Sequence, residues 1–432
     1  MRQSSPKPRD KHTGSGELIG LHKRTSRGLN PLLGGLSGAV VALVLAYVGS
    51  YLQTRFGFGV VGTRGSRVTG AEVFVRSALN LYALHHVPLE GTGQIHDSFG
   101  SVVRVSASIV LPLTVWSVIP LAALLVGGFA VGSGRPDAGY KRTILCGVFC
   151  GILYGAALGC LTPLVRGKLD FFLLPQVGGL APNPPPIEFY PSASGALLNG
   201  CSFGAAFSML GALFAASRLH RKRGRSSKWW ACGKAVFVCA LIVQTLFALA
   251  LLGYVLFESE SAEASNQRIV EMLPTAAGLG YSMIHGAALI SSVESQLKGG
   301  PVQKAFYARV DLYGVIQKGN ETRRVDTALR IVALFVVAAV GVVGGRLAVR
   351  WGSVDGSLPT GFRCALLHSA YLSLLPKLCS MFLRQSDPIS SVSISIGALF
   401  GWRLLVSFGC VLVCAIIGAQ SYRRSRLFVQ PS

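Results

Sequence analysis

Residues 143–165 read TILCGVFCGILYGAALGCLTPLV, and only the flanking residues Arg142 and Arg166 are charged. A helix needs about 20 apolar residues to cross the hydrocarbon core of a bilayer, so this run is long enough to span it. Glycine recurs at every fourth position, which places four glycines on one helical face: Gly147, Gly151, Gly155 and Gly159. Small residues let membrane helices approach closely, so this face predicts tight packing, with a sliding or gating face as the alternative. Gly200 and Gly204 have the same spacing and mark the expected partner helix.

The composition of the whole chain also favours a membrane protein. Of its 432 residues 51% are hydrophobic and only 14% are charged, and the mean hydropathy is +0.51. Soluble domains carry about 25% charged residues, and disordered chains combine low hydrophobicity with high charge, so both classes are excluded. The sequence predicts an all-α polytopic membrane protein with about eight spans, at 31–52, 105–131, 143–165, 196–216, 231–257, 327–350, 363–383 and 393–419.

The positive charges predict the orientation of these spans. With the N-terminus in the cytoplasm, 23 of the 41 Lys and Arg residues fall in the short inner segments, while 14 of the 18 acidic residues fall outside. The positive-inside rule therefore places both termini in the cytoplasm of a cell-membrane protein. The expected parts are two basic cytoplasmic tails and two membrane halves, at 1–29, 30–228 with an outer loop over 53–104, 229–420 with an outer loop over 258–326, and 421–432.

The spacing of the spans predicts an internal duplication. Each half has four spans, the first two separated by a long outer loop, so the repeats would be parallel rather than inverted. Gly127-Gly128 ends the second span and Gly344-Gly345 ends the sixth. A Tyr-x-x-x-His pattern occurs in both long loops, over 82–86 and 281–285.

The first outer loop concentrates four residues that could bind a metal: His85, His86, His96 and Asp97. Imidazole and carboxylate groups are zinc ligands, but their spacing here matches no zinc motif. Segment 71–89 also has the pattern of an amphipathic helix lying at the membrane interface, and 268–292 has the same character. We expect the interfacial helix, and no metal or other cofactor.

Ionisable residues inside spans are the default candidates for a transport pathway. His368 lies in the seventh expected span, with Tyr371 one turn later and Lys377 after Pro376, and Arg403 lies in the eighth. The two cations could also extend to the membrane surface. The sequence shows no recognised catalytic motif and no acidic residue deep in a span, so we expect no enzyme activity.

The segment Ala78-Leu-Asn-Leu-Tyr-Ala-Leu-His-His-Val-Pro88 follows a glycine-rich first span with Gly34-Gly35-Leu-Ser-Gly38. In these features the chain resembles uncharacterised haloarchaeal multi-pass membrane proteins with a Tyr-x-x-His segment in the loop after the first span. That resemblance implies no known activity.

Two functions remain open. The chain could be a transporter or channel-like protein for a small anionic or neutral solute, with a pathway between its halves. It could instead be a membrane scaffold or assembly factor without a pathway, while a membrane enzyme built on the outer histidines is the remote third reading. The expected partners are the bilayer and its anionic headgroups, which would contact basic inner segments such as 218–225. The sequence leaves open whether the protein forms a homo- or hetero-oligomer. Because the basic residues lie between spans, we expect no nucleic-acid partner.

Overall fold

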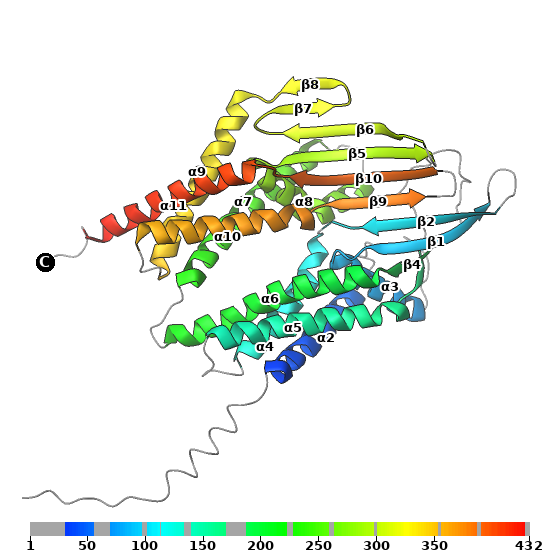
Figure 1. Cartoon of the computed structure of the whole chain (residues 1–432), viewed down its shortest axis with the longest axis horizontal. Helices are drawn as coiled ribbons and strands as arrows, with labels where there is room; N and C mark the ends of the chain where they lie inside the picture. The colour runs from blue at the N-terminus through cyan, green and yellow to red at the C-terminus, as the bar shows by residue number, and fades with distance from the viewer. Residues whose placement is uncertain are drawn as a thin grey trace, which may run out of the picture.

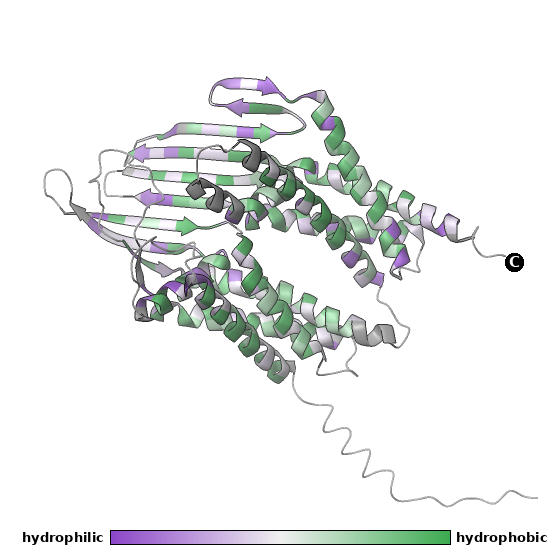
Figure 2. Ribbon diagram, turned by 180° about the vertical axis from the view of Figure 1, so that it is seen from behind, coloured by the Kyte–Doolittle hydropathy of each residue, from purple (hydrophilic) through white to green (hydrophobic). Residues whose placement is uncertain are grey.

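The computed structural model describes residues 31–55, 70–96, 102–112, 114–133, 140–169, 187–222, 228–258, 263–297, 300–352, 356–386 and 390–427. Two groups of helices stand side by side, and one β-sheet continues from the same end of both (Figure 1). The chain is a membrane-embedded protein, because seven helices within these described residues are long and apolar enough to cross a bilayer. Figure 2 shows these helices as largely hydrophobic, with polar residues on the strands and near helix ends.

The first half of the chain contains four long helices, a shorter helix and four strands. In chain order these are α2 (Pro31–Arg55), α3 (Gly70–Leu84), β1 (Leu89–His96), β2 (Val102–Val110), α4 (Val118–Ser133), α5 (Tyr140–Leu161), β3 (Gly167–Leu169), β4 (Ile187–Pro191) and α6 (Ala193–Lys222).

The second half has the same order of elements with one added hairpin, β7–β8. It consists of α7 (Lys228–Glu258), α8 (Glu263–Ile284), β5 (Ala288–Leu297), β6 (Val302–Asp311), β7 (Val315–Lys318), β8 (Glu321–Arg324), α9 (Thr327–Arg350), α10 (Ser357–Leu378), β9 (Met381–Ser386), β10 (Ser390–Leu399) and α11 (Arg403–Leu427).

The seven candidate spans lie in α2, α4, α5, α6, α7, α9 and α11. The remaining expected span, 363–383, corresponds to α10, which packs along α7, α9 and α11. It has the length to cross a bilayer, but Arg363, His368 and Lys377 lower its hydropathy, and residues 381–383 belong to strand β9. A count of eight spans therefore stays a prediction.

The prediction of an all-α fold was wrong, because the described residues include a ten-stranded sheet in the order β3-β4-β1-β2-β9-β10-β5-β6-β7-β8. Two of its strands had been merged with spans: the helix expected from residue 105 begins at Val118, and the one expected from residue 393 begins at Arg403. Strand β10 reads SSVSISIGAL, in which serine alternates with apolar residues. This period of two is a strand signal. Hydropathy averaged over the length of a membrane span hides it, because the apolar residues of the strand are then counted with the helix that follows.

The two faces of the sheet differ. Strand register places Leu89, Ile109 and Leu383 in one row of a single face, and all three are buried in the largest hydrophobic cluster together with residues of α3. In the second half Ile396 and Ala398 of the same face pack against Leu279 and Tyr281 of α8. Helices α3 and α8 therefore cover the apolar face, and Figure 1 shows the opposite face of the central strands free of helices.

Glycines set the closest helix contacts, in the same way in both halves. A Cβ built on Gly128 of α4 would fall far inside van der Waals distance of the carbonyl oxygen of Ser208 in α6, and one on Gly211 of α6 would do the same to Leu125 of α4. In the second half Gly345 of α9 meets Ala415 of α11, and Gly418 of α11 meets Val342 of α9. We call each of these reciprocal contacts a glycine lock.

The glycine face of α5 lies against α6. Gly151 contacts the backbone of Gly204 and Ala205, and Gly155 contacts Gly200 and Cys201, while Gly147 lies against Ser208 and Met209. Gly159 is at ordinary van der Waals distance from Leu197. The small stripe thus forms a close helix-packing surface, and Gly200 and Gly204 supply its counterpart.

Helices of the two halves are joined mainly through the sheet. The extensive contacts between long helices lie within one half, whereas β2 of the first half pairs with β9 of the second over Ser106–Val110 and Phe382–Ser386. The turn Val115–Ser117 also contacts α8. The strands, rather than packed membrane helices, therefore fix the two groups of helices relative to each other.

Candidate functional site

The uncovered face of the sheet carries two polar rows that run across both halves. Pairing places Glu90, Ser108, Arg384, Ser393, Glu294 and Lys304 in one row over six strands. The next row holds Thr92, Ser106, Ser386, Ser391 and Gln296. All these side chains are exposed or half-buried. We call this surface the polar sheet face. In its first row carboxylates and cations alternate, with a serine on either side of Arg384, and its second row offers hydroxyl groups on strands that lie about 4.8 Å apart.

Side chains reinforce the junction between the halves. The hydroxyls of Ser106 and Ser386 are 2.7 Å apart across β2 and β9. His86 also reaches across: its Nδ1 lies 2.6 Å from the carbonyl oxygen of Leu111, and its Nε2 lies 3.5 Å from the hydroxyl of Ser380. Burial lowers the pKa of His86, so at neutral pH its imidazole takes part in these contacts without a charge.

Helices α3 and α8 each end in a turn, and the two turns have the same geometry. The amide of Val87 donates to Tyr82 and that of Ala287 donates to Ser282, while His86 and Gly286 have positive φ angles of 59° and 98°. This geometry aligns His85 with His285. The Tyr-x-x-x-His pattern of the sequence instead pairs His86 with His285, one position away. The shift arises because the helix-ending turn, rather than the tyrosine, defines the equivalent positions.

In the first half, His85 is held by two partners. Its Nδ1 lies 2.7 Å from the carbonyl oxygen of Leu81, and its Nε2 lies 2.8 Å from the hydroxyl of Tyr154 in α5. The hydroxyl of Tyr82 donates to the carbonyl of Leu158 at 2.7 Å. Both ring nitrogens of His85 are thus satisfied by the protein, which is the usual state of a structural buried histidine.

The second half has a larger buried polar cluster at the corresponding place. The hydroxyl of Tyr281 lies 2.8 Å from Nε2 of His368, and the centres of the His285 and His368 rings are 4.5 Å apart. Nδ1 of His285 lies 3.0 Å from the hydroxyl of Ser407. Within the described part of the chain, Nε2 of His285 and Nδ1 of His368 have no hydrogen-bond partner. Unsatisfied buried nitrogens are uncommon and call for an explanation.

The four predicted pathway residues lie in three different settings. His368 is fully buried in this cluster, and Tyr371 accepts a hydrogen bond from Gln244 of α7. Lys377 is exposed in the last turn of α10, next to the sheet. Arg403 begins α11 and forms an ion pair with Asp311, whose side chain is only 4% exposed. The structure therefore groups His368 and Tyr371, and separates them from the two cations.

Sequence reasoning missed the polar sheet face and several members of the buried sites, among them Asp311, Ser407 and Gln244. Asp311 lies at the end of a strand within an expected outer loop, Ser407 is an isolated serine in a span, and Gln244 is an uncharged residue in α7. Gln244 was the one with a usable signal, because amides are rare in the middle of an apolar span and tend to bond across helices.

The metal candidates are not gathered into one site by the described residues. His85 and His86 are neighbours in the chain, but their rings contact different partners. Asp97 and the side chain of His96 lie outside the described residues. No group of three or more possible metal ligands occurs in the part of the chain that the structure describes.

Acid should destabilise the protein through His85. Burial lowers the pKa of His85 from 6.5 to about 4, so the unfolded chain binds more protons between these values. The free energy of unfolding should therefore fall as the pH is lowered through 6.5 toward 4, with His85 contributing a loss of about 2 kcal/mol by pH 5. Unfolding of purified protein at pH 7 and pH 5 measures this loss. The variant His85→Gln should show a pH dependence weaker by that amount, and an unchanged pH dependence would contradict the assignment.

No protein-family model, curated protein sequence or solved structure matches the chain.

Proposed function

We propose that this protein is a membrane scaffold whose polar sheet face holds a hydrophilic domain of a partner protein. One observation carries the proposal: this face continues from β2 to β9 without a break. The two groups of membrane helices therefore present one surface. Alternating charges and ordered hydroxyls suit a hydrophilic protein surface, because they provide donors and acceptors in fixed register.

The parallel duplication explains how this surface arose. The equivalent glycine locks, the equivalent turns at His85 and His285, and the repeated order of elements all support it. In each half the strands follow the same order, so the second half continues the sheet where the first half ends. A second copy of the unit adds its strands at one edge of the sheet. The polar sheet face becomes wider, and the membrane helices of the two copies need not contact each other.

We infer the orientation from the positive charges. Described strands occur only between α3 and α4, α5 and α6, α8 and α9, and α10 and α11, which places them at one end of the helices (Figure 1). The other connections and both tails carry the higher density of Lys and Arg. By the positive-inside rule the sheet would face away from the cytoplasm of a cell-membrane protein, with both termini cytoplasmic. Anionic headgroups are then the expected contacts of 218–225.

A transport pathway has less support. Such a pathway was expected between the halves, yet the extensive helix contacts lie within each half. Arg403 is paired with Asp311, and Lys377 is exposed beside the sheet, so neither is a cation held deep within a helical bundle.

Site-specific photocrosslinking tests the scaffold. A benzoylphenylalanine placed at Ser391 on the polar sheet face should form one discrete protein adduct in cells that make the protein. The same group at Val413, which is 57% exposed on α11, is the lipid-facing control and should give none of this adduct. Reversing a charge in the centre of the face, Arg384→Glu, should reduce the Ser391 adduct at least tenfold while the amount of folded protein stays the same.

Two results would overturn the scaffold. One is the absence of any adduct specific to the polar sheet face. The other is chloride or glycerol flux into vesicles containing the purified protein that is lost in Lys377→Ala, since such flux would favour a channel or transporter.

A further inference from the structure

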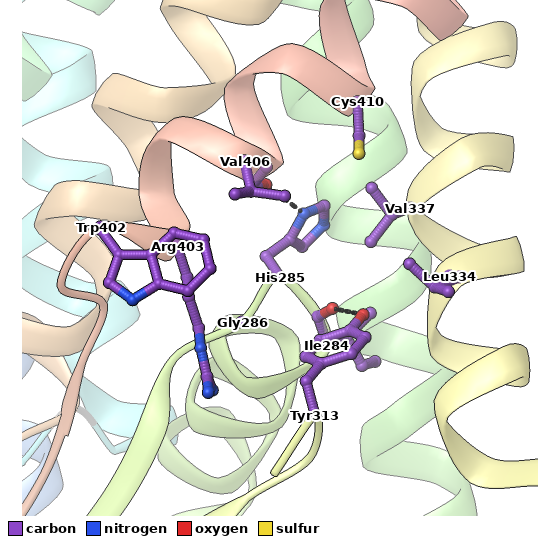
Figure 3. Close-up of a pocket in the computed structure, with 11 residues that line it drawn as sticks. Ile284, His285, Gly286, Tyr313, Leu334, Val337, Trp402, Arg403, Val406 and Cys410 are labelled. Atoms are coloured by element: carbon purple, nitrogen blue, oxygen red, sulfur yellow. Dashed lines mark hydrogen bonds between the residues drawn. The ribbon is translucent and has the colours of Figure 1, made fainter. Parts of the chain in front are cut away.

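A cavity of about 190 Å³ lies between α9, α11 and the turn after α8 (Figure 3). Apolar side chains such as Ile284, Leu334, Val337 and Val406 form much of its wall. Four polar side chains also line it, those of His285, Tyr313, Arg403 and Ser407. The two helices are held together at the glycine lock of Gly345 and Gly418, and the nearest lining residues of the cavity, Val337 and Cys410, lie eight residues from it. Figure 1 shows the two helices diverging toward the sheet. Its position thus follows from the geometry of the helix crossing.

The cavity contains one unsatisfied polar group. His285 is 2% exposed and lies between Val406, Cys410 and Val337, while Arg403 extends away from its ring (Figure 3). One ring nitrogen, Nδ1, is held by the hydroxyl of Ser407, and Nε2 has no partner in the described structure. Burial lowers the pKa of His285 well below its usual range, so its ring is neutral and can donate or accept one hydrogen bond at Nε2.

The cavity borders the side of the helices that faces lipid. Leu334 of α9 and Val406 of α11 line it and are 51% and 49% exposed, and Trp402, at 71%, lies at its edge. Exposed apolar residues on helices of membrane-spanning composition contact acyl chains, so a solute dissolved in the bilayer can reach this opening.

The first half has a large side chain at the position equivalent to one wall of this cavity. Phe203 precedes Gly211 by eight residues, as Cys410 precedes Gly418, so the two glycine locks align Phe203 with Cys410. Phe203 is buried in the core of the first half, and there His85 has protein partners on both ring nitrogens. The second half has a small thiol at this position and an unpartnered histidine nitrogen beside it.

We propose that this cavity binds a lipophilic ring compound from the bilayer, or the ring end of a larger lipid, through one oxygen that hydrogen-bonds to Nε2 of His285. An apolar cavity of about 150 Å³ accommodates benzene, so the volume suits a single substituted ring. If Nε2 carries the proton, it donates to the oxygen, which is then a carbonyl or a hydroxyl. If Nδ1 carries the proton, Nε2 accepts, and the oxygen is a hydroxyl.

Fluorine NMR of the full chain in lipid nanodiscs tests the proposal with three probes of similar size. These are para-fluorotoluene, which has no oxygen, para-fluorophenol, which can donate, and para-fluoroacetophenone, which can only accept. At least one oxygen-containing probe should bind the wild type about tenfold more tightly than it binds His285→Leu, the usual effect of one hydrogen bond to a buried group. Para-fluorotoluene should bind both proteins with similar affinity. The ketone identifies the tautomer, because it gains from His285 only if Nε2 carries the proton, whereas the phenol can bind to either form.

A cavity-filling variant keeps the test independent of His285. Cys410→Phe copies the first half and should abolish binding of all three probes, while Cys160→Phe, at an exposed cysteine of α5, should leave binding unchanged. The proposal is overturned if both oxygen-containing probes bind wild type and His285→Leu equally, or if Cys410→Phe, shown to be folded by its unfolding temperature, still binds them. Neither result bears on the polar sheet face, so the scaffold stands or falls separately.

Discussion

The substitution Gly418→Ala should destabilise the protein by about 3 kcal/mol, although it adds only one methyl group. That methyl would overlap the carbonyl oxygen of Val342 in α9, and backbone atoms cannot move aside as a flexible side chain can. The two helices would have to separate along the whole crossing, which would disrupt the packing that holds membrane helices together. Gly211→Ala, at the equivalent lock of the first half, should have the same effect.

The same helix contains a matched control. Gly409 also lies inside α11, but a Cβ there would have no neighbour within 4 Å. Gly409→Ala should be neutral or stabilise the protein by up to about 1 kcal/mol, because alanine is the better helix former. Unfolding of the purified variants in mixed micelles measures both effects. Equal stability of Gly418→Ala and Gly409→Ala would show that the lock does not hold the second half together.

Removing the carboxylate of Asp311 is the second change with a large expected effect. Asp311 is 3% exposed, pairs with Arg403 and accepts a hydrogen bond from the amide of Tyr313 at 3.1 Å. Because Asp311 is the last residue of β6, its ion pair joins the end of this strand to the start of α11. Asp311→Ala leaves the partly buried guanidinium without a counter-ion, so we expect a loss of about 3 kcal/mol in the free energy of unfolding.

An exposed ion pair of the same sheet provides the comparison. Arg323 and Glu321 lie 4.0 Å apart with side chains 83% and 78% exposed, so Glu321→Ala should cost less than about 0.5 kcal/mol. The double variant Asp311→Ala with Arg403→Ala should recover part of the loss, because it also removes the unpaired charge. If Asp311→Ala and Glu321→Ala destabilise the protein equally, the ion pair with Arg403 has no structural role.

Sequence patterns predicted the membrane helices well, because the signal is local. Segment 327–350 begins and ends where α9 does, and the glycine face of 143–165 packs on the predicted partner. The amphipathic character of 71–89 marked α3 within a few residues. These predictions worked because hydropathy and helical period depend on neighbouring residues only.

Patterns of the same kind could not give the sheet. Strands β2 and β9 are separated by more than 250 residues, and their pairing depends on two distant connections between helices meeting in space. The His285 cluster is similar: it combines α8, α10 and α11, and no spacing along the chain relates His285, His368 and Ser407.

The sequence by itself determined that this chain is embedded in a membrane, where its helices lie and which helix faces carry glycine. Only the tertiary structure decided that segments between its helices form a single sheet, that Arg403 has a partner in Asp311, and that His285 has a nitrogen without one among the described residues. The physical reason is the range of the interactions. Transfer of a helix into lipid depends on the residues of that helix, whereas strand pairing, ion pairs and cavities depend on distant segments that only the fold brings together.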